Sequence, residues 1–556
     1  MKYPQKLLTT IILTLSSASL CAQTTLIKNV QGYTLNGESL QEFSAITFTD
    51  DKIDKLFSKG DKIANQADWK IIDGNGATML PGLIDAHGHV LNYGQSLMTA
   101  DLVGTRSQQA AVQRTLNYAK ENQSQTWITG RGWNQVQWDI KSFPTKESLD
   151  TAFPDKPVWL RRVDGHAGWA NSKAMALAGI TRQTKSPDGG SIIKDENGEP
   201  TGVFIDNAMA LIEKNIAPLT LAQQKSILLK AMQSLASLGL TSVHDAGIDS
   251  ETLSAFQQLS DEGKMPIRIN AMLYLPTKHW QKTLDKGTFH SSDDMLNFNS
   301  VKIQADGALG SRGAAMIEDY SDHAGHKGLL LHDNSSLTKY INYAMQAGFQ
   351  VNTHAIGDNA NKIVLDLYQT AIKKNNSKAL RHRVEHAQIL RLKDIPRFNE
   401  LGIIASMQAT HATSDKNMAV DRIGEERILG AYAWRKLLNA DTIIAAGSDF
   451  PVESANPFFG LHASVTRQDK QNSPKHGWYP EEKMTRVEAL KTFTIDAAYS
   501  GHQEKIIGSL AAGKKADFIL LTDNYFTSDE TKLWKNQVLS TWVNGVKVYQ
   551  KQQQSF

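Results

Sequence analysis

The sequence has 556 residues, of which 41% are hydrophobic, 21% charged and 8% aromatic. This globular composition excludes wholesale disorder and fibrous repeats, and the length suggests two or three domains. The formal net charge is only +3 and no basic block stands out, so nucleic-acid binding has no electrostatic support. The single cysteine, Cys21, excludes a disulfide framework and a cysteine-based metal cluster. A metal site would therefore have to use histidine, carboxylate or a less usual ligand.

Residues 1–22 have the features of a secretory signal peptide. Two lysines precede the apolar run LLTTIILTL (7–15), which is too short to span a bilayer, and the small-residue segment SSASLCA (16–22) follows it. We expect cleavage after Ala22 and export of the mature chain, most simply to the periplasm, with no membrane span in the mature part. A buried N-terminal helix or a membrane anchor is the alternative.

Cys21 lies beside the expected cleavage site, which makes lipoprotein processing a further alternative. We rank it second, because Leu20 is bulky where that processing needs a small residue. Signal cleavage would remove the cysteine and leave a mature chain without a thiol, which suits an extracytoplasmic compartment.

Short strand-like segments separated by turn residues lie near both ends of the chain. They are residues 26–29, 45–49 and 69–72 near the N-terminus and residues 516–521, 538–543 and 546–549 near the C-terminus. We expect the two groups to form one small β-sandwich, built from residues 23–80 and 501–556.

The middle of the chain, residues 81–500, alternates apolar strand-like runs with helical stretches. The eight runs are 82–86, 241–244, 267–274, 300–305, 349–353, 382–385, 403–407 and 442–447. Strands alternating with helices predict a parallel sheet, and eight of them predict a (β/α)8 TIM barrel. The long gap after the first run predicts an inserted α+β subdomain at about residues 95–235, because ordinary connections are short.

Several of these runs carry side chains that can bind metal or move protons. The first run ends in His87-Gly88-His89, and residues i and i+2 of a strand share a face. Later runs carry or end in Lys302, His354, His386 and Asp449. The C-terminal strand ends of a TIM barrel meet at one mouth, where active sites lie, so we expect these side chains to converge.

Each of these residues also has an ordinary structural interpretation. A strand-end histidine often only hydrogen-bonds, a lysine usually faces solvent, and an aspartate after Gly-Ser often caps a turn. Their arrival from five runs at one mouth favours a metal site. Neutral imidazoles suit a divalent ion such as Zn²⁺, which lowers the pKa of bound water to about 7, and Asp449 could accept the released proton. An ammonium would repel the ion, so Lys302 either lies outside the ligand shell or is chemically changed.

Seven segments spread over the mature chain form a recognisable set. They are LPGLIDAHGH (80–89), DGHAGWANS (164–172), KIQADGALGSRGAA (302–315), THAIGD (353–358), RHRVEHAQ (381–388), GSDFPVE (447–453) and GKKADFILL (513–521). In this order the set resembles the amidohydrolase superfamily, in the amidohydrolase-3 (YtcJ-like) branch that includes N-substituted formamide deformylases. The resemblance implies a metal-dependent hydrolase with a (β/α)8 barrel and a small β-sandwich built from both termini.

The resemblance also implies roles for single residues. His87 and His89 match ligands of the more buried metal ion, and Asp449 completes that site and serves as the proton shuttle. His354 and His386 match ligands of a second ion.

Lys302 falls where many members of the superfamily carry an N-carboxylated lysine that bridges two ions. A carbamate is an anionic oxygen ligand, so this modification would remove the conflict between lysine and metal. Whether the site holds one ion or two therefore stays open.

Further residues are candidates for contact with substrate or for orienting ligands. The candidates for substrate contact are Asp164, His166, Trp133, Arg312, Gln408 and His411. The candidates for orienting ligands by hydrogen bonds are Asp306, Asp358 and Glu385. A packed core position is the alternative for Trp133. Ala409 stands where the family often has proline, which concerns the shape of that loop but no ligand.

We therefore expect an exported metal-dependent hydrolase that cleaves a non-peptide C–N bond, an amide, in a small-molecule substrate. Hydrolysis of an ester, lactone or cyclic amide in the same site is one alternative. A non-catalytic extracytoplasmic binding protein is another, although a receptor has no need of a proton shuttle beside a metal. The sequence sets neither the substrate nor the oligomeric state, and it is compatible with a homo-oligomer.

Overall fold

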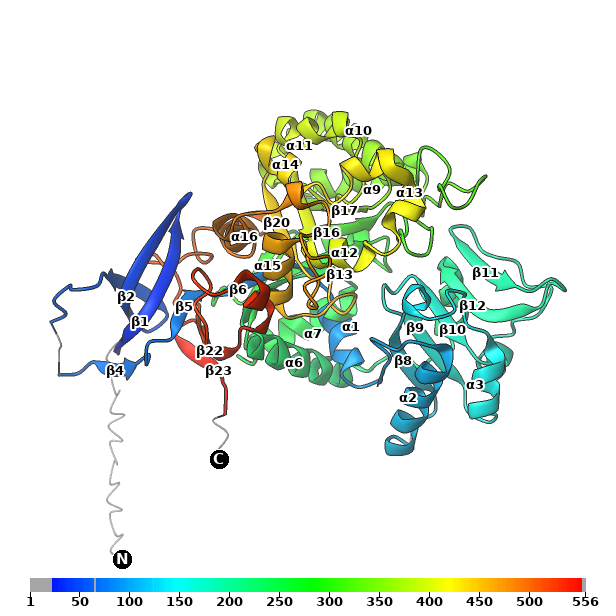
Figure 1. Ribbon diagram of the computed structural model, residues 1–556, viewed down its shortest axis with the longest axis horizontal. Helices are drawn as coiled ribbons and strands as arrows, with labels where there is room; N and C mark the ends of the chain where they lie inside the picture. The colour runs from blue at the N-terminus through cyan, green and yellow to red at the C-terminus, as the bar shows by residue number, and fades with distance from the viewer. Residues whose placement is uncertain (1–22, 65–66, 124, 553–556) are drawn as a thin grey trace, which may run out of the picture.

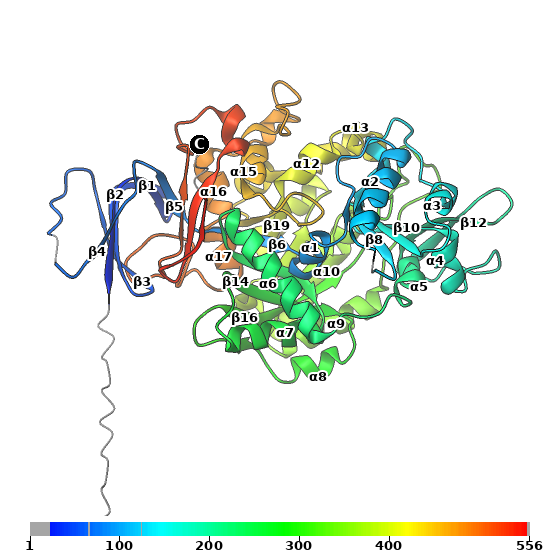
Figure 2. The same cartoon turned by 90° about the horizontal axis from the view of Figure 1, so that it is seen from below.

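The computed structural model describes residues 23–64, 67–123 and 125–552. The predictions about residues 1–22, from signal cleavage to export and lipid attachment, lie outside the described residues and stay predictions. Figures 1 and 2 show three parts in a row: a sheet of strands from both ends of the chain, a central barrel, and a smaller sheet with helices on the far side. Within the described ranges, no helix combines the length and apolar character needed to cross a membrane.

The central part is a barrel of eight parallel strands, as predicted. Each predicted apolar run forms one strand, and neighbours in the barrel follow the order of the chain. Most residues of these strands are buried, as expected where helices cover the outer face. The strands are β6 (Leu83–Gly88), β13 (Leu240–Ile248), β14 (Arg268–Leu275), β16 (Leu296–Gln304), β17 (Gln350–Ala355), β18 (Arg383–His386), β19 (Ile404–Gln408) and β20 (Ile444–Gly447). A two-residue strand, β15 (Phe289–His290), pairs antiparallel with β16.

Backbone hydrogen bonds at the C-terminal ends of the first and last strands join these two strands. The amide of Asp449 donates to the carbonyl of His87 (2.7 Å), and the amide of His89 donates to the carbonyl of Phe450 (2.9 Å). Gly447 permits this approach, because a Cβ there would lie 2.6 Å from the backbone nitrogen of His87. The C-terminal ends of β6 and β20 are thereby held side by side.

Helices follow the barrel strands and cover the barrel. α6 illustrates how the sequence forms them: Thr220 and Gln223 make a reciprocal capping box, and buried residues then recur every three or four positions along one face. The helices are α1 (Val90–Ser96), α6 (Leu221–Ser237), α7 (Ser250–Asp261), α8 (Trp280–Leu284), α9 (Asn334–Gln346), α10 (Asp358–Asn375), α11 (Ile395–Leu401), α12 (Ala409–Asp415), α13 (Ala419–Arg427), α14 (Trp434–Asn439), α15 (Pro457–Thr466), α16 (Arg486–Thr492) and α17 (Ile495–Ser500).

An α+β insertion lies between α1 and α6, as the sequence predicts. Its sheet has the order β11-β12-β10-β9-β8-β7 and its own hydrophobic core. The strands are β7 (Ala100–Asp101), β8 (Ile128–Trp133), β9 (Val158–Arg162), β10 (Ala167–Ala170), β11 (Gly190–Lys194) and β12 (Pro200–Asp206). The helices are α2 (Gln108–Glu121), α3 (Lys146–Ala152), α4 (Ser172–Leu177) and α5 (Ala210–Glu213). The domain boundaries derived from the sequence stay predictions.

Strands from both ends of the chain build one hydrogen-bonded sheet. Its order is β23-β22-β21-β5-β1-β2-β3, with β4 paired to β1. The two ends meet where β21 pairs antiparallel with β5. The strands are β1 (Thr24–Asn36), β2 (Ser39–Thr49), β3 (Lys52–Phe57), β4 (Lys70–Asp73), β5 (Thr78–Pro81), β21 (Phe518–Leu521), β22 (Val538–Val543) and β23 (Val546–Gln550). A buried ion pair between Arg268 at the start of β14 and Asp517 (2.8 Å) ties this sheet to the barrel.

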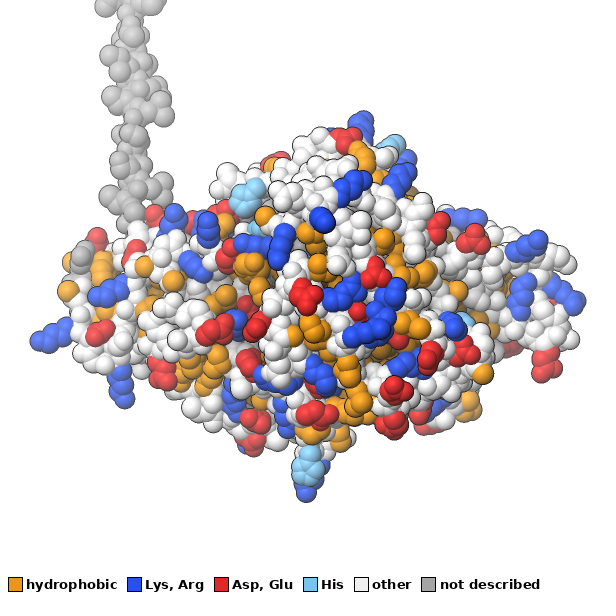
Figure 3. All heavy atoms as spheres, turned by 90° about the horizontal axis from the view of Figure 1, so that it is seen from above, with side chains coloured by type: hydrophobic (Ala, Val, Ile, Leu, Met, Phe, Trp, Pro, Cys, Tyr) orange, Lys and Arg blue, Asp and Glu red, His pale blue; other side chains and the backbone are white. Residues whose placement is uncertain are grey.

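Charges of both signs are interspersed on the face of the molecule in Figure 3, with apolar side chains scattered among them. This distribution agrees with the small net charge of the chain. It gives that face no extended basic surface of the kind that binds nucleic acid.

Candidate metal centre

A cavity of about 1850 Å³ opens at the C-terminal ends of the barrel strands, between the barrel and the insertion. Its wall contains all six residues predicted to bind metal and three of those predicted to contact substrate: His87, His89, Lys302, His354, His386, Asp449, Asp164, His166 and His411. The structure therefore brings together side chains that are hundreds of positions apart in the sequence.

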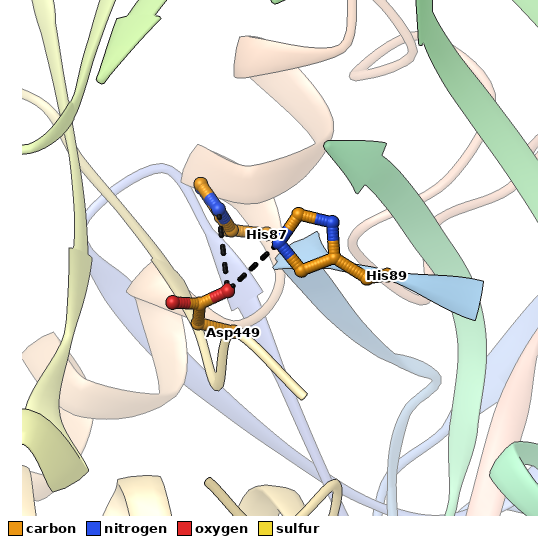
Figure 4. Close-up of side chains that lie close together, drawn as sticks. All are labelled: His87, His89 and Asp449. Atoms are coloured by element: carbon orange, nitrogen blue, oxygen red, sulfur yellow. Dashed lines mark ion pairs between the residues drawn. The ribbon is translucent and has the colours of Figure 1, made fainter. Parts of the chain in front are cut away.

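His87, His89 and Asp449 form one tight group (Figure 4). One carboxylate oxygen, Asp449 Oδ1, lies 3.0 Å from His89 Nε2 and 3.6 Å from His87 Nε2. Asp449 adopts a left-handed backbone conformation (φ 59°), which is uncommon for a residue other than glycine and is often found at functional sites.

A second group shares the same carboxylate. His386, His411 and Asp449 offer ligand atoms within 4.8 Å of one another, and His411 Nε2 lies 3.7 Å from the other oxygen, Asp449 Oδ2. The rings of His354 and His386 are 4.5 Å apart between centroids. Asp449 thus lies between the two histidines at the end of β6 and a second pair, His386 at the end of β18 and His411 after β19.

Lys302 reaches the same cluster from β16. Its Nζ lies 3.2 Å from His87 Nε2, and the side chain is buried. Burial lowers the pKa of this amine to about 8. The lysine therefore lies inside the cluster of candidate ligands, where a simple ammonium would oppose a bound cation.

The burial of the histidines favours the form that can bind metal. Burial lowers the pKa of His87 to about 3 and that of His386 well below its ordinary value. These imidazoles are therefore neutral near pH 7 and keep a lone pair for a cation. Burial alone would raise the pKa of Asp449, but the neighbouring imidazole of His89 helps to hold it well below the ordinary value, so this group is a carboxylate.

The donor atoms in the cavity fit a divalent ion. His354 Nε2, His411 Nε2 and Asp449 Oδ1 are buried and have no hydrogen-bond partner within the described ranges. Buried polar atoms are rarely left unpaired, so their convergence points to a ligand that they share. Imidazole nitrogens and carboxylate oxygens are donors that zinc and similar ions accept.

Buried polar side chains behind the cluster orient two of the histidines. His87 Nδ1 hydrogen-bonds Glu385, whose carboxylate is held by Arg383 through two nitrogens (2.7 and 2.9 Å). His386 Nδ1 pairs with Gln408 Oε1 at 2.8 Å. Both contacts engage Nδ1 and so leave Nε2 as the ring nitrogen that could bind an ion, the usual arrangement in histidines that bind metal.

Comparison with known proteins places the chain in a family. The amidohydrolase family model matches residues 70–549. The chain belongs to the amidohydrolase family. It is 34% identical over 485 residues to the putative amidohydrolase YtcJ of Bacillus subtilis (strain 168), covering 86% of this chain and 90% of that protein.

Two further relatives agree with this membership. An N-substituted formamide deformylase of Arthrobacter pascens is 26% identical over 498 residues, covering 87% of this chain and 90% of that protein. The crystal structure of an uncharacterized metal-dependent hydrolase from Pyrococcus horikoshii OT3 superimposes with a TM-score of 0.72 at 26% identity, over 91% of this chain and 99% of that chain. Family and ligand cluster together support a metal-dependent hydrolase that uses a divalent ion.

Two of the residues predicted to contact substrate in this amidohydrolase are in the insertion and reach the cavity. Asp164 and His166 belong to the turn between β9 and β10. His166 Nδ1 hydrogen-bonds Asp206 Oδ1 at 2.6 Å, and this carboxylate raises the pKa of His166 against the opposing effect of burial. The turn therefore holds a histidine beside the candidate metal ligands, with its ring centroid 5.9 Å from that of His354.

Three residues predicted to contact substrate do not line the cavity. Trp133 is fully buried in the core of the insertion, where its Nε1 donates to the carbonyl of Leu160 (2.8 Å). Arg312 is partly exposed and pairs with Asp322 (2.9 Å). Gln408 lies behind His386, as described above, and so orients a histidine instead of facing the cavity.

Of the candidates for orienting ligands, Asp306 is buried beside a histidine of the cluster. Asp306 accepts hydrogen bonds from the amides of Ala315, Ile356 and Gly357, and its Oδ1 lies 3.4 Å from His354 Nε2. Asp358, by contrast, accepts from the amide of Ile317 and fixes the start of α10.

Sequence reasoning missed Asp85, which is fully buried in β6. Its carboxyl accepts hydrogen bonds from the amides of His87 and Ser448 and from the hydroxyl of Ser448 (2.6 Å). The residue thereby anchors the loop that carries Asp449 to the strand that carries His87. An acidic side chain inside the apolar run LPGLIDAHGH was the available signal.

Proposed function

We propose that the chain is an amidohydrolase that cleaves a non-peptide C–N bond, an amide, with Asp449 as the group that moves the proton. The observation that carries this proposal is the position of Asp449 between the two groups of histidines: one of its oxygens lies near His89 and the other near His411. The similarity to an N-substituted formamide deformylase supports an amide as the substrate.

Five side chains would hold the metal: His87, His89, His354, His386 and Asp449. Zn²⁺ is the ion that we propose, because the donors are imidazole nitrogens and a carboxylate. A divalent ion held there supplies Lewis acidity, which polarises a substrate carbonyl and makes water a better nucleophile near pH 7.

Asp449 carries out the proton transfers. Its carboxylate accepts a proton from the attacking water and delivers it to the departing nitrogen, which cannot leave as an amide anion. His166 also lines this cavity: its Nδ1 is engaged by Asp206, and its Nε2 lies 3.5 Å from the side-chain nitrogen of Gln304. We propose that this Nε2–H donates a hydrogen bond to the substrate oxygen on which negative charge develops.

We propose that Lys302 is N-carboxylated and that the site then holds two ions. The amine lies 3.2 Å from His87 Nε2 within the ligand cluster, and a carbamate there would be an anionic oxygen ligand. With an unmodified lysine, one ion is expected.

The test is a turnover assay on the zinc-loaded protein with N-formyl amines, N-acyl amines, esters and lactones. We expect hydrolysis of amides, and in Asp449→Asn a decrease of about 10²- to 10⁴-fold, the usual effect of losing a general acid–base group. Asp322→Asn removes a carboxylate that lies outside the cavity wall and should leave turnover close to that of the wild type.

Three outcomes would contradict the proposal. Undiminished turnover in Asp449→Asn with metal retained would remove Asp449 from the mechanism. Hydrolysis of esters or lactones without any turnover of amides would place the substrate in another class. Tight binding of small molecules without turnover of any substrate would favour a receptor.

A further inference from the structure

Arg131 brings a positive charge from the insertion to the cavity wall. It lies on β8 directly opposite Arg161 on the parallel strand β9, and both side chains line the cavity. Like charges opposite one another on neighbouring strands destabilise a sheet unless something neutralises them. The pair therefore needs negative charge from elsewhere in the chain or from a ligand.

The chain neutralises the arginines next to Arg131. Arg161 Nε lies 3.3 Å from Glu213 Oε1, and Arg162 forms an ion pair with Asp164. Of these three arginines, Arg131 is the one for which no ion pair is found among the described residues.

The surroundings of Arg131 orient it without neutralising it. Its Nη2 donates to the backbone carbonyl of Val163 (2.8 Å), but no carboxylate lies within 4.0 Å in the described part of the chain. Gly165, in the same turn as Val163, packs closely against the guanidinium of Arg131, since a Cβ at this position would lie 3.2 Å from Nη2. The group is therefore held in a fixed direction at the edge of the cavity.

Arg131 and the ligand cluster belong to one cavity. Burial and the charge of Arg161 lower the pKa of Arg131 to about 9, which leaves it a cation at neutral pH, while the carboxylates of Asp449, Asp164 and Glu213 act to raise this pKa. A substrate whose amide reaches Asp449 can therefore present an anionic group to Arg131. A guanidinium matches a carboxylate in shape and forms charge-assisted hydrogen bonds with it.

We propose that Arg131 binds a carboxylate of the substrate, so that the preferred substrates are amides of the N-acyl amino acid type and not neutral amides. This inference rests on the proposed amide hydrolysis and adds the substrate class. Arg131 is then a residue that determines specificity, while the reacting bond is served by the cluster around Asp449.

Two formamides that differ only in the carboxylate provide the test. N-formylphenylalanine has it, and N-formyl-2-phenylethylamine is the same molecule without it. We expect the wild type to favour the acid, and Arg131→Gln to lose about ten- to a hundredfold in kcat/KM for the acid, mainly through KM. The neutral formamide should be hydrolysed at nearly the wild-type rate.

Lys141→Gln is the matched control, because Lys141 is an exposed cation on the wall of the same cavity. It should leave the preference for the acid unchanged. Equal losses on both formamides in Arg131→Gln, or the same selective loss in Lys141→Gln, would overturn the inference. So would a wild type that does not discriminate between the two compounds.

A binding measurement separates this inference from the proposed hydrolysis. 3-Phenylpropanoate and 3-phenylpropan-1-ol contain no amide or other bond that the proposed reaction could cleave, and their Kd for the zinc-loaded protein can be measured by calorimetry whether or not formamides are hydrolysed. We expect the acid to bind more tightly to the wild type and to lose this advantage in Arg131→Gln. An advantage that persists in the variant would show that the carboxylate binds elsewhere, for example on the metal, and would overturn the inference.

Discussion

At the scale of single residues, the orientation of the His87 imidazole depends on side chains that do not line the cavity. Glu385 accepts a hydrogen bond from His87 Nδ1, and Arg383 holds Glu385 from behind while also donating to the hydroxyl of Ser406 (2.8 Å). All are buried, so none can exchange its partner for water. The orientation of the imidazole is therefore set before any ion binds.

Glu385→Gln should weaken metal binding. The amide cannot balance the charge of Arg383 or hold Nδ1–H as a carboxylate does, so we expect the metal Kd to rise by about 10- to 100-fold. The protein should also lose about 3–5 kcal/mol of unfolding free energy, the cost of leaving a buried charge unpaired. Metal competition titration and denaturant unfolding measure the two effects.

Asp517→Asn is the matched control for this variant. It breaks another buried ion pair, with Arg268, at the junction of the barrel and the terminal sheet. A similar loss of stability with an unchanged metal Kd is expected. Equal weakening of metal binding in both variants would show that Glu385 acts only through overall stability.

Lys302 gives a second prediction at this scale. If the amine is carboxylated, protein equilibrated with carbon-13-labelled bicarbonate should show a carbamate resonance that is absent in Lys302→Ala. The variant should bind fewer ions and lose turnover, and a short carboxylate such as propanoate should restore part of it. A wild-type spectrum without the resonance, together with two tightly bound ions, would contradict the proposal.

Single residues were predictable from the sequence where the strand pattern placed them. His87, His89, His354, His386 and Asp449 follow or end strands, so the topology of a barrel is enough to bring them together. Trp133 and Arg312 were misplaced, because a tryptophan suits a core as well as a cavity and an arginine suits a surface ion pair. The sequence could not show that Arg131 lacks an ion-pair partner, because this depends on which carboxylates the fold brings next to the neighbouring arginines.

At the scale of elements, the cluster depends on how closely β20 approaches β6. Gly447 has no room for a side chain, since a Cβ would lie 2.6 Å from both the backbone nitrogen of His87 and Asp85 Oδ1. The His87 nitrogen is a backbone atom of a buried strand, so this contact cannot be relieved by a side-chain rotation. The junction that positions Asp449 beside His87 is thus sensitive to a single methyl group.

Gly447→Ala should lower the unfolding free energy by about 1–3 kcal/mol, the usual cost of overpacking, and should also weaken metal binding. Gly263→Ala is the control: its backbone is left-handed (φ 62°), but nothing lies within 4 Å of the added Cβ. The control should lose stability by backbone strain alone and keep the metal Kd of the wild type. Unchanged metal binding in Gly447→Ala would contradict this account of the junction.

Two helices beside the barrel are joined by an ion pair whose effect depends on pH. Arg435 on α14 contacts both oxygens of Glu488 on α16 (2.6 and 2.8 Å), and Glu488 also accepts from the amide of Thr485. The hydrogen bonds from Arg435 lower the pKa of Glu488 to about 2. A carboxyl group whose pKa is lower in the folded protein than in the unfolded chain stabilises the fold at pH values above its pKa in the unfolded chain. This contribution to the free energy of unfolding is lost as the pH falls towards the pKa in the folded protein.

Glu488→Gln should therefore lower the free energy of unfolding by about 1–2 kcal/mol at pH 7. The effect is no larger because the ion pair is partly exposed to solvent. The difference from the wild type should narrow as the pH falls from 5 towards 3, because the unfolded wild type takes up a proton in that range. Urea unfolding of both proteins at several pH values measures this difference in unfolding free energy. A difference in unfolding free energy that does not change with pH would show that the variant loses stability through packing and not through the ion pair.

At the scale of the whole molecule, alternation of apolar runs with helical stretches was enough to predict the barrel and its insertion. Each of the eight runs became a strand, because parallel strands covered on both faces are apolar almost throughout. The terminal strands were predicted less completely: β1 is 13 residues long and pairs with β4 and then β5 across a bulge. Such pairing depends on register between distant segments, which composition does not specify.

The central claim is that hydrolysis depends on the ions held by the histidines and Asp449. Its most direct test is stepwise addition of Zn²⁺ to metal-free protein, with turnover of an N-formyl substrate and bound metal measured on the same samples. We predict that turnover is absent without metal, rises in proportion to bound ion and stops rising after one or two equivalents, while Asp449→Asn binds metal without recovering turnover. Turnover that persists undiminished in the metal-free protein would contradict the account.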